Sequence, residues 1–167
     1  MINFEDIYNI YFKRVFAFLF KLCSDYSLAE DLTQETFYQA FSSLKNFKGN
    51  SDIFTWLATI AKRCYYKHIK KTKHTLEFNG GYIYEICADE EEIADTHDEI
   101  QRKELSCVIN NLLETLPEKQ HDVVILRIYA DLSFKEIAKA LSISESSAKV
   151  LFFRAKNAIA DELEKEI

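Results

Sequence analysis

The stretch LSFKEIAKALSISESSAKVLFFRAK, residues 132–156, decides how the rest of the chain is interpreted. It predicts two short helices around a tight turn at Ser142–Ser144. Ser133 and Glu136 form the reciprocal capping pair that is typical of a helix start, and apolar residues follow at helical spacing. This is the layout of a helix-turn-helix, whose second helix enters the major groove of DNA. An ordinary helical hairpin is the alternative interpretation.

The composition favours a helical protein with a real hydrophobic core. Three glycines and one proline argue against a strand-and-turn architecture. Hydrophobic residues make up 48% of the chain, which suffices for one domain or two small ones. The N-terminus does not resemble a signal peptide, and no apolar run approaches the roughly 20 residues that span a membrane. We therefore expect a cytoplasmic protein with no direct membrane insertion.

Charge is distributed unevenly along the chain. The net charge of −6 argues, taken alone, against nucleic-acid binding. Residues 1–75, however, carry 11 Lys/Arg against 7 Asp/Glu, a balance of +4. Residues 76–104 carry 2 against 10, a balance of −8, and residues 105–167 carry 8 against 10, a balance of −2. An acidic connector between two less acidic parts is therefore expected.

The N-terminal third predicts two amphipathic helices. The first covers roughly Phe4 to Cys23, and the second runs from Ser27 to about Leu44. Ser27 and Glu30 suggest a capping pair at the start of the second helix. A row of polar and aromatic residues follows on one side of that helix: Asp31, Gln34, Glu35 and Tyr38.

A third helix, roughly Asp52 to Lys71, presents two different faces. One face is apolar and suits a core. The other combines one aromatic ring with three cations at helical spacing, namely Trp56, Arg63, Lys67 and Lys70. Cations for phosphates and a ring for an unstacked base suit a nucleic-acid strand. A solvated basic face beside a core tryptophan is an equally good interpretation of the spacing alone.

The helical pattern breaks between Lys73 and Asp98, where Asn79-Gly80-Gly81 is a turn signal and an acidic run follows. After this break, one helix leads to Thr115 and another starts near Pro117. The helix-turn-helix stretch, residues 132–156, comes next. The predicted fold is therefore all-α, with two small helical domains joined by a flexible acidic linker. The C-terminal domain contains the helix-turn-helix.

Enzymatic and metal sites have little support in the sequence. Glu30, Asp31 and Glu35 share a helix, but no Glu-x-x-His partner accompanies them. Cys64 and His68 share a face, but a complete ligand set for zinc is missing. The sequence holds neither a CxxC pair nor a glycine-rich phosphate loop. We therefore expect no enzymatic activity, no metal and no cofactor.

Three blocks of the sequence resemble one family. AEDLTQETFYQAF at 29–41 resembles a signature for binding core RNA polymerase, and FKGNSDIFTWLATIAKRCYYKHIKK at 47–71 resembles a promoter-melting segment. LPEKQHDVVILRIYADLSFKEIAKALSISESSAKVLFFRAK at 116–156 resembles the DNA-binding region 4 of the same family. By these blocks the chain is identified as a member of the bacterial extracytoplasmic-function (group IV) sigma factors of the sigma-70 superfamily. Those subunits direct RNA polymerase to promoters.

The resemblance implies a division of the chain into three parts. Region 2, at 1–75, would bind core polymerase and recognise and melt the −10 element. Residues 76–100 would form the linker. Region 4, at 101–167, would recognise the −35 element through the helix-turn-helix.

The resemblance also implies roles for individual residues. The positions that face core polymerase, at the clamp helices of its largest subunit, are Asp31, Gln34, Glu35 and Tyr38. The loop that receives a base flipped from the −10 element is Phe47, Lys48, Gly49, Asn50 and Ser51, and the helix that holds the single strand contributes Trp56, Arg63, Lys67 and Lys70. The −35 positions are Ser146, Ser147, Lys149, Val150, Phe153 and Arg154.

The implied partners are core RNA polymerase, at its clamp helices and its flap, and promoter DNA, as duplex at −35 and single strand at −10. An anti-sigma factor and control by stress or another signal are further expectations from the resemblance. Family members commonly carry a basic residue where this chain has Leu151 and a polar one where it has Val150. Backbone contacts and DNA shape should therefore matter more at −35. A stand-alone helix-turn-helix regulator, which would bind a palindrome as a dimer, is the alternative function.

Overall fold

The computed structural model describes residues 3–78 and 97–166, and all elements in these two ranges are helical. This agrees with the all-α fold expected from the sequence. The acidic run of the expected linker lies outside the described residues. Helix α3 (Ile53–Phe78) ends and helix α4 (His97–Glu114) begins at its two sides.

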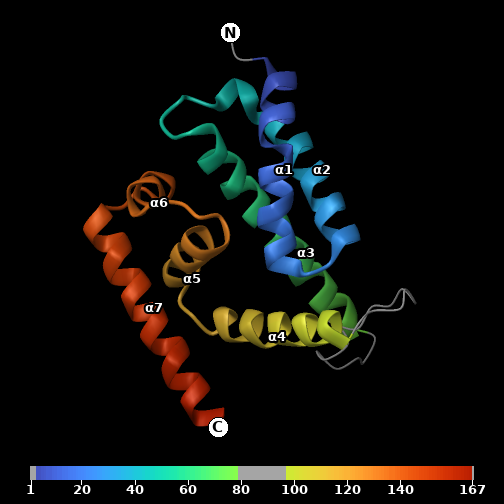
Figure 1. Ribbon diagram of the computed structural model, residues 1–167. Helices are drawn as coiled ribbons and strands as arrows, with labels where there is room; N and C mark the ends of the chain where they lie inside the picture. The colour runs from blue at the N-terminus through green and yellow to red at the C-terminus, as the bar shows by residue number, and fades with distance from the viewer. Residues whose placement is uncertain (1–2, 79–96, 167) are drawn as a thin grey trace.

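The N-terminal half consists of three helices packed side by side (Figure 1). Helix α1 (Phe4–Cys23) has the bounds that its apolar periodicity predicts. Helix α2 (Tyr26–Ser43) continues into a short 3₁₀ turn, η1 (Leu44–Asn46), and α3 follows. Their shared core includes side chains that are almost entirely buried, such as Phe18, Phe54 and Leu57.

The expected cap of the second helix is wrong. Asp25, not Ser27, caps α2, because its Oδ1 accepts a hydrogen bond from the Leu28 backbone N–H at 2.8 Å. The helix therefore begins at Tyr26, and Ser27 lies within its first turn. A carboxylate just before the helix satisfies the same free N–H groups that a serine pair would satisfy.

The C-terminal half begins with α4 and α5 (Glu118–Val124). Helix α5 runs directly into a π-helical turn, η3 (Ile125–Tyr129). Helices α6 (Phe134–Leu141) and α7 (Glu145–Glu166) follow. The Ala130 N–H bonds to the Ile125 carbonyl at 3.3 Å, which is the wide spacing of a π-turn. This turn places the buried side chains of Ile125 and Leu126 against the first half of the molecule.

The helix-turn-helix is formed by α6 and α7, as predicted. The Ser133 side chain accepts from the Glu136 N–H at 3.2 Å, and the Glu136 carboxylate accepts from the Ser133 N–H at 2.7 Å. Ser142 ends α6 in the left-handed conformation, with φ 54° and ψ 46°. Ser144 Oγ accepts from the Ser147 N–H at 3.0 Å and so satisfies the start of α7. Local capping chemistry therefore sets this motif.

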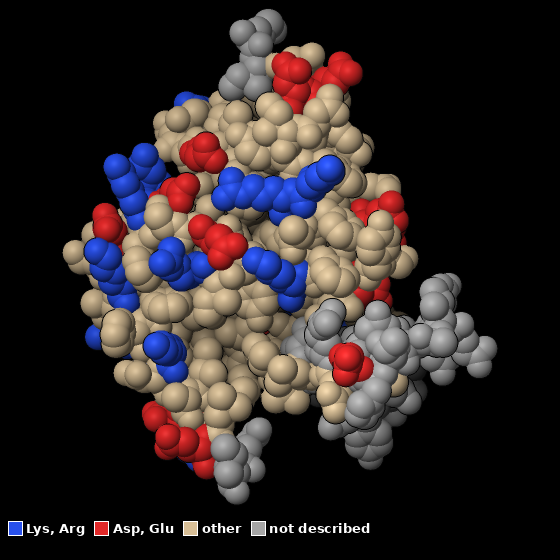
Figure 2. Space-filling view, in the orientation of Figure 1, with Lys and Arg blue, Asp and Glu red and all other residues tan. Residues whose placement is uncertain are grey.

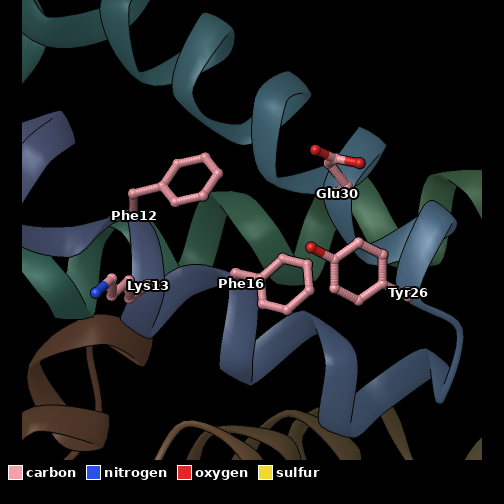
Figure 3. Close-up of a pocket in the computed structure, with 5 residues that line it drawn as sticks. All are labelled: Phe12, Lys13, Phe16, Tyr26 and Glu30. Atoms are coloured by element: carbon pink, nitrogen blue, oxygen red, sulfur yellow. The ribbon is translucent and has the colours of Figure 1, made fainter.

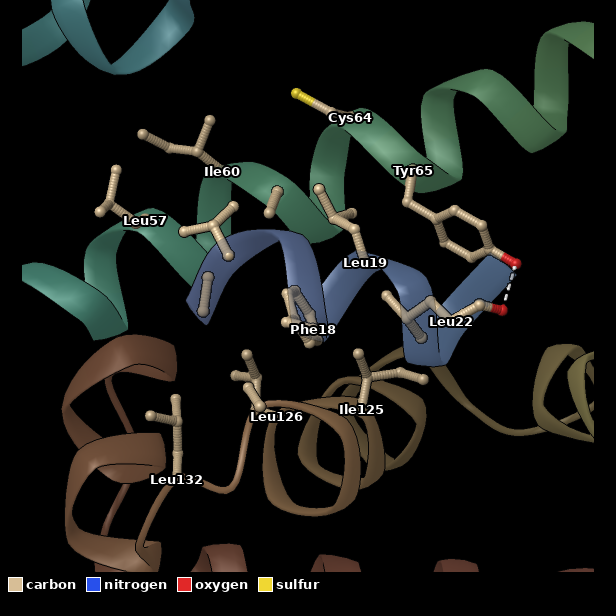
Figure 4. Close-up of a cluster of buried hydrophobic side chains, with 14 of the residues drawn as sticks. Phe18, Leu19, Leu22, Leu57, Ile60, Cys64, Tyr65, Ile125, Leu126 and Leu132 are labelled. Atoms are coloured by element: carbon tan, nitrogen blue, oxygen red, sulfur yellow. Dashed lines mark hydrogen bonds between the residues drawn. The ribbon is translucent and has the colours of Figure 1, made fainter. Parts of the chain in front are cut away.

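The two halves share one hydrophobic core rather than standing apart. Phe18 and Leu22 of α1 face Ile125, Leu126 and Leu132 of the second half (Figure 4). Helices α1 and α3 contact α4, η3 and α6. The N-terminal and C-terminal helices therefore form one compact body in this structure.

Candidate functional site

The predicted polymerase-binding row lies on the outer side of α2. Asp31, Gln34 and Glu35 are exposed, and Tyr38 is 69% exposed. The opposite side of the helix is buried: the Thr33 and Thr36 hydroxyls donate to carbonyls one turn earlier, at 2.6 and 2.7 Å. The structure therefore brings the four predicted residues together on one accessible surface that carries two carboxylates and an aromatic ring.

A small aromatic hollow lies between α1 and α2, close to that row (Figure 3). Phe12 and Phe16 of α1 and Tyr26 of α2 line it, with Lys13 and Glu30 at its edges, and its volume is about 230 Å³. The Tyr26 ring meets the Phe16 ring edge to face at 5.2 Å. Sequence reasoning did not select these residues, because apolar periodicity alone does not distinguish rings that pack in a core from rings that line a hollow.

The basic face of α3 is formed as the spacing predicts. Arg63, Lys67 and Lys70 are exposed, whereas Trp56 is half-buried rather than a core residue. The Trp56 indole packs against the Phe47 ring, with a centroid separation of 4.8 Å and an interplanar angle of 35°. An aromatic pair thus lies at the head of a row of three cations, a combination that suits a single strand.

The loop before α3 is open on its outer side. Lys48, Gly49 and Asn50 are exposed, and Ser51 is half-buried. Gly49 has φ +70°, a conformation that a side chain rarely adopts, although no atom lies within 4 Å of the place where its Cβ would be. Glycine is therefore required there by the backbone and not by lack of space.

The start of α7 presents the predicted −35 residues to solvent. Ser146, Ser147, Lys149 and Arg154 are exposed, Val150 is 48% exposed, and Phe153 is 66% exposed. The side of the molecule that carries α6 and α7 shows Lys and Arg side chains interspersed with acidic ones (Figure 2). Lys149 forms an ion pair with Glu145 at 3.1 Å. A DNA phosphate would therefore compete with Glu145 for this ammonium group.

A hollow of about 400 Å³ borders the same face. It is lined by Ser146, Ser147, Val150 and Arg154 together with Ile143, Leu151 and Lys119. Lys119 is exposed in the first turn of α5, and sequence reasoning missed it. The sequence shows Lys119 only as a cation two residues after the proline that begins a helix. The fold is what places Lys119 beside α7.

The described residues contain no group of three or more His, Cys, Asp or Glu side chains arranged to hold a metal ion. Among the helices that the structure describes, none combines the length and apolar character needed to cross a membrane.

Family models match both halves of the chain. Residues 7–75 match sigma-70 region 2, and residues 108–159 match sigma-70 region 4. The chain is also 31% identical over 161 residues to the RNA polymerase sigma factor YlaC of Bacillus subtilis, covering 92% of this chain and 88% of that protein. The chain belongs to the sigma-70 family of RNA polymerase sigma factors. Its similarity to the ECF sigma factor SigM of Bacillus subtilis, at 26% identity over 91% of this chain and 90% of that one, places it in the ECF class.

Solved structures support the fold of this sigma factor. The sigma factor RpoE of Bartonella quintana, crystallised with the anti-sigma factor NepR, matches with a TM-score of 0.61 at 22% identity, over 96% of both chains. CnrH, in complex with the cytosolic domain of CnrY, matches with a TM-score of 0.62 at 15% identity, over 98% of this chain and 89% of that one.

Family membership confirms the main functional expectations. Sigma factors are initiation factors without enzymatic activity, and they bind core RNA polymerase and promoter DNA. The chain is therefore a subunit that directs polymerase to promoters, and the stand-alone regulator is not favoured.

Proposed function

We propose that this sigma factor recognises promoters at two points, with region 2 within residues 1–75 and region 4 within residues 101–167. Region 2 binds the clamp helices of the polymerase and captures the melted −10 strand. Region 4 binds the −35 duplex and the polymerase flap. The observation that carries this proposal is the aromatic pair Phe47–Trp56 at the head of the basic face of α3.

In region 2, binding to polymerase and binding to DNA use different helices. The carboxylates Asp31 and Glu35 lie outward on α2 and suit a basic partner surface. Arg63, Lys67 and Lys70 lie outward on α3 and suit phosphates. The loop at Phe47–Ser51 receives the flipped base, and Trp56 supplies a stacking surface that offsets part of the cost of unstacking.

In region 4, the first three turns of α7 enter the major groove. Arg154 and Lys149 supply cations, and Phe153 and Val150 supply apolar contact to base methyl groups. Ser146 and Ser147 lie near the helix start, where backbone N–H groups and hydroxyls suit a phosphate. Lys119 borders the same hollow and is assigned a contact to the DNA backbone.

We further infer that the protein acts in the cytoplasm, under the control of a signal and of an anti-sigma factor. Two solved structures of similar fold contain a partner protein: RpoE has the anti-sigma factor NepR, and CnrH has the cytosolic domain of CnrY. An anti-sigma factor that competes with polymerase requires an accessible surface, and the exposed row on α2 provides one.

A set of matched variants tests the assignment of surfaces. The pair Asp31→Ala and Glu35→Ala should weaken binding to core polymerase about tenfold while leaving −35 duplex binding unchanged. The pair Asp161→Ala and Glu164→Ala removes the same charge from exposed positions at the end of α7 and should change neither. Equal losses of polymerase binding in both pairs would refute the assignment of α2.

A further inference from the structure

Arg63 differs from the lysines of the basic face in how its side chain is held. Its Nε donates a long hydrogen bond, 3.5 Å, to the Thr59 carbonyl one turn earlier in α3. This bond turns the side chain toward the end of the helix that carries Trp56, and away from Lys67. Arg63 is exposed, so the rest of its guanidinium is accessible to a ligand.

The terminal nitrogens of Arg63 are not committed to an acid within residues 3–78 and 97–166. None of the ion pairs in these ranges includes Arg63, and its hydrogen bond to Thr59 uses Nε. Lys149 of α7, by contrast, is paired with Glu145. Arg63 can therefore bind a ligand without first breaking an ion pair.

Trp56 and Arg63 lie on the same side of α3, because seven residues fall only about 20° short of two full turns. At a rise of 1.5 Å per residue, they are about 10 Å apart along the helix axis. Three stacked nucleotides at about 3.4 Å each span the same length. Arg63 is therefore within reach of a base one to three nucleotides away from a base at Trp56.

The turn of α3 between these two side chains carries no charge on this side. Thr59 is half-buried, and its hydroxyl donates to a backbone carbonyl one turn earlier at 2.9 Å. Ile60 is buried, and the two lysines of the basic face follow only beyond Arg63. A strand that runs along α3 is therefore expected to direct bases, rather than phosphates, toward this turn.

Guanidinium and ammonium groups suit different parts of a nucleotide. Arginine presents a planar fork that can donate to two neighbouring acceptors, and O6 and N7 of guanine are such a pair. Lysine presents a compact charge that suits a phosphate. The base edges of a melted strand are accessible to side chains. The order of side chains along α3 therefore suits a stacked base, then a guanine, then phosphates.

We propose that Arg63 selects guanine at one position of the melted −10 strand, one to three nucleotides from the base that stacks on Trp56. This inference rests on the proposed function, in which region 2 holds that strand. Lys67 and Lys70 bind the strand regardless of its sequence. The promoters of this sigma factor therefore share a guanine within the −10 element.

Arg63→Ala and Arg63→Lys test this proposal together, with Lys67→Ala as the matched control. Arg63→Ala removes both the fork and the charge, whereas Arg63→Lys keeps the charge and removes the fork. Lys67→Ala removes one charge from the same exposed face, one turn later. Both positions are exposed, so the helical circular dichroism of the three variants should equal that of the wild type.

Transcription from a randomised library measures base preference. A promoter mapped with the wild-type protein is randomised across its −10 region, and the templates that yield transcripts with core polymerase are sequenced. The wild type should prefer guanine about tenfold at one position. Both Arg63 variants should lose this preference. Lys67→Ala should keep it and reduce transcription from all templates alike.

A single-stranded −10 oligonucleotide tests the contact at one atom. A guanine analogue with carbon in place of N7 should weaken binding to the wild-type holoenzyme about tenfold. The same analogue should not further weaken binding to the Arg63→Ala holoenzyme, because the fork that contacts N7 is absent. A purely structural role of Arg63 would not produce this difference.

Three results would overturn the proposal. They are a guanine preference that persists in Arg63→Ala, one that Arg63→Lys retains, and a wild type without a guanine preference at any −10 position. The second result would assign Arg63 to a phosphate. Transcripts that do not depend on the sigma factor would instead refute the proposed function itself, so the two failures are distinguishable.

Discussion

The Trp56 indole lies against the Phe47 ring, with centroids 4.8 Å apart, at the point where the loop of residues 47–51 meets the basic face of α3. The two side chains come from different elements, so neither the loop nor the helix forms this surface alone. Under the proposed function, a base that leaves the duplex at the −10 element meets the loop and the indole together.

Replacing Trp56 by alanine should impair promoter opening selectively. Stacking of a base on an aromatic side chain contributes about 1–3 kcal/mol, so open-complex formation should fall by about tenfold or more. Binding of a −35 duplex should not change. Permanganate reactivity of the melted strand and duplex binding by anisotropy measure the two effects. Trp56→Phe keeps an aromatic ring, so its open-complex formation should fall less. Equal losses of open-complex formation and of −35 duplex binding in Trp56→Ala would count against the assignment of Trp56 to the melted strand.

Replacing Arg154 by alanine should impair −35 duplex binding rather than promoter opening. Its side chain is exposed at the hollow beside α7, so −35 duplex binding should weaken by about 1–3 kcal/mol. Lys165→Ala is the matched control, because Lys165 is an exposed cation at the far end of the same helix. Titrations at two salt concentrations distinguish loss of a base contact from loss of a phosphate contact. Unchanged affinity for Arg154→Ala would remove it from the contact set.

The turn of the helix-turn-helix offers a stability prediction. Ser142 holds a left-handed conformation that glycine adopts without steric cost, so Ser142→Gly should raise the free energy of unfolding by about 0.5–1 kcal/mol. Ser144→Ala should lower it by about 1 kcal/mol, because the Ser147 N–H loses its acceptor. Chemical denaturation measures both. Destabilisation by Ser142→Gly would contradict the strain assigned to this position.

Local features of the sequence predicted much of this fold. The Ser133–Glu136 capping box, the bounds of α1 and the separation of the two faces of α3 depend on residues within one or two helical turns. The cap of α2 was misassigned to Ser27, whereas the carboxylate of Asp25, two residues earlier, accepts the hydrogen bond from the Leu28 N–H. Capping propensity alone does not decide which of two nearby residues caps a helix.

Contacts between distant segments could not be predicted. Lys62 and Asp122 are 60 residues apart, and neither belongs to a local motif that would pair them. The π-helical turn at Ile125–Tyr129, which contacts α1, was likewise not predicted from the sequence pattern. Lys119 was missed for the same reason, since only the fold brings it to the start of α7.

The ion pair between Lys62 of α3 and Asp122 of α5, whose charged atoms lie 2.6 Å apart, predicts a dependence of stability on pH. Burial alone would raise the pKa of Asp122, but hydrogen bonds from His121 and Lys62 outweigh it and hold the pKa below the ordinary value of 3.8. A carboxylate with a lowered pKa in the folded state stabilises above its unfolded pKa and loses that contribution as pH falls through the folded value.

The free energy of unfolding should therefore fall with acidification below about pH 4. The fall should be shallower in the variant with Lys62→Met and Asp122→Leu, which lacks this carboxylate. Glu136 remains in both proteins, and hydrogen bonds from Ser133 lower its pKa as well, so part of the slope should persist. Identical slopes, measured by denaturation at a series of pH values, would exclude a role for Asp122.

Two-point promoter recognition is tested most directly by mapping transcript starts. Core polymerase is incubated with genomic DNA of the source bacterium, with and without this protein, and the 5′ ends of the transcripts are sequenced. The expected result is a set of new start sites that share one motif near −10 and one near −35, with usage reduced by Trp56→Ala and by Arg154→Ala. Two-point promoter recognition would be contradicted if the start sites did not differ from those of core polymerase alone, or if they shared no −35 motif.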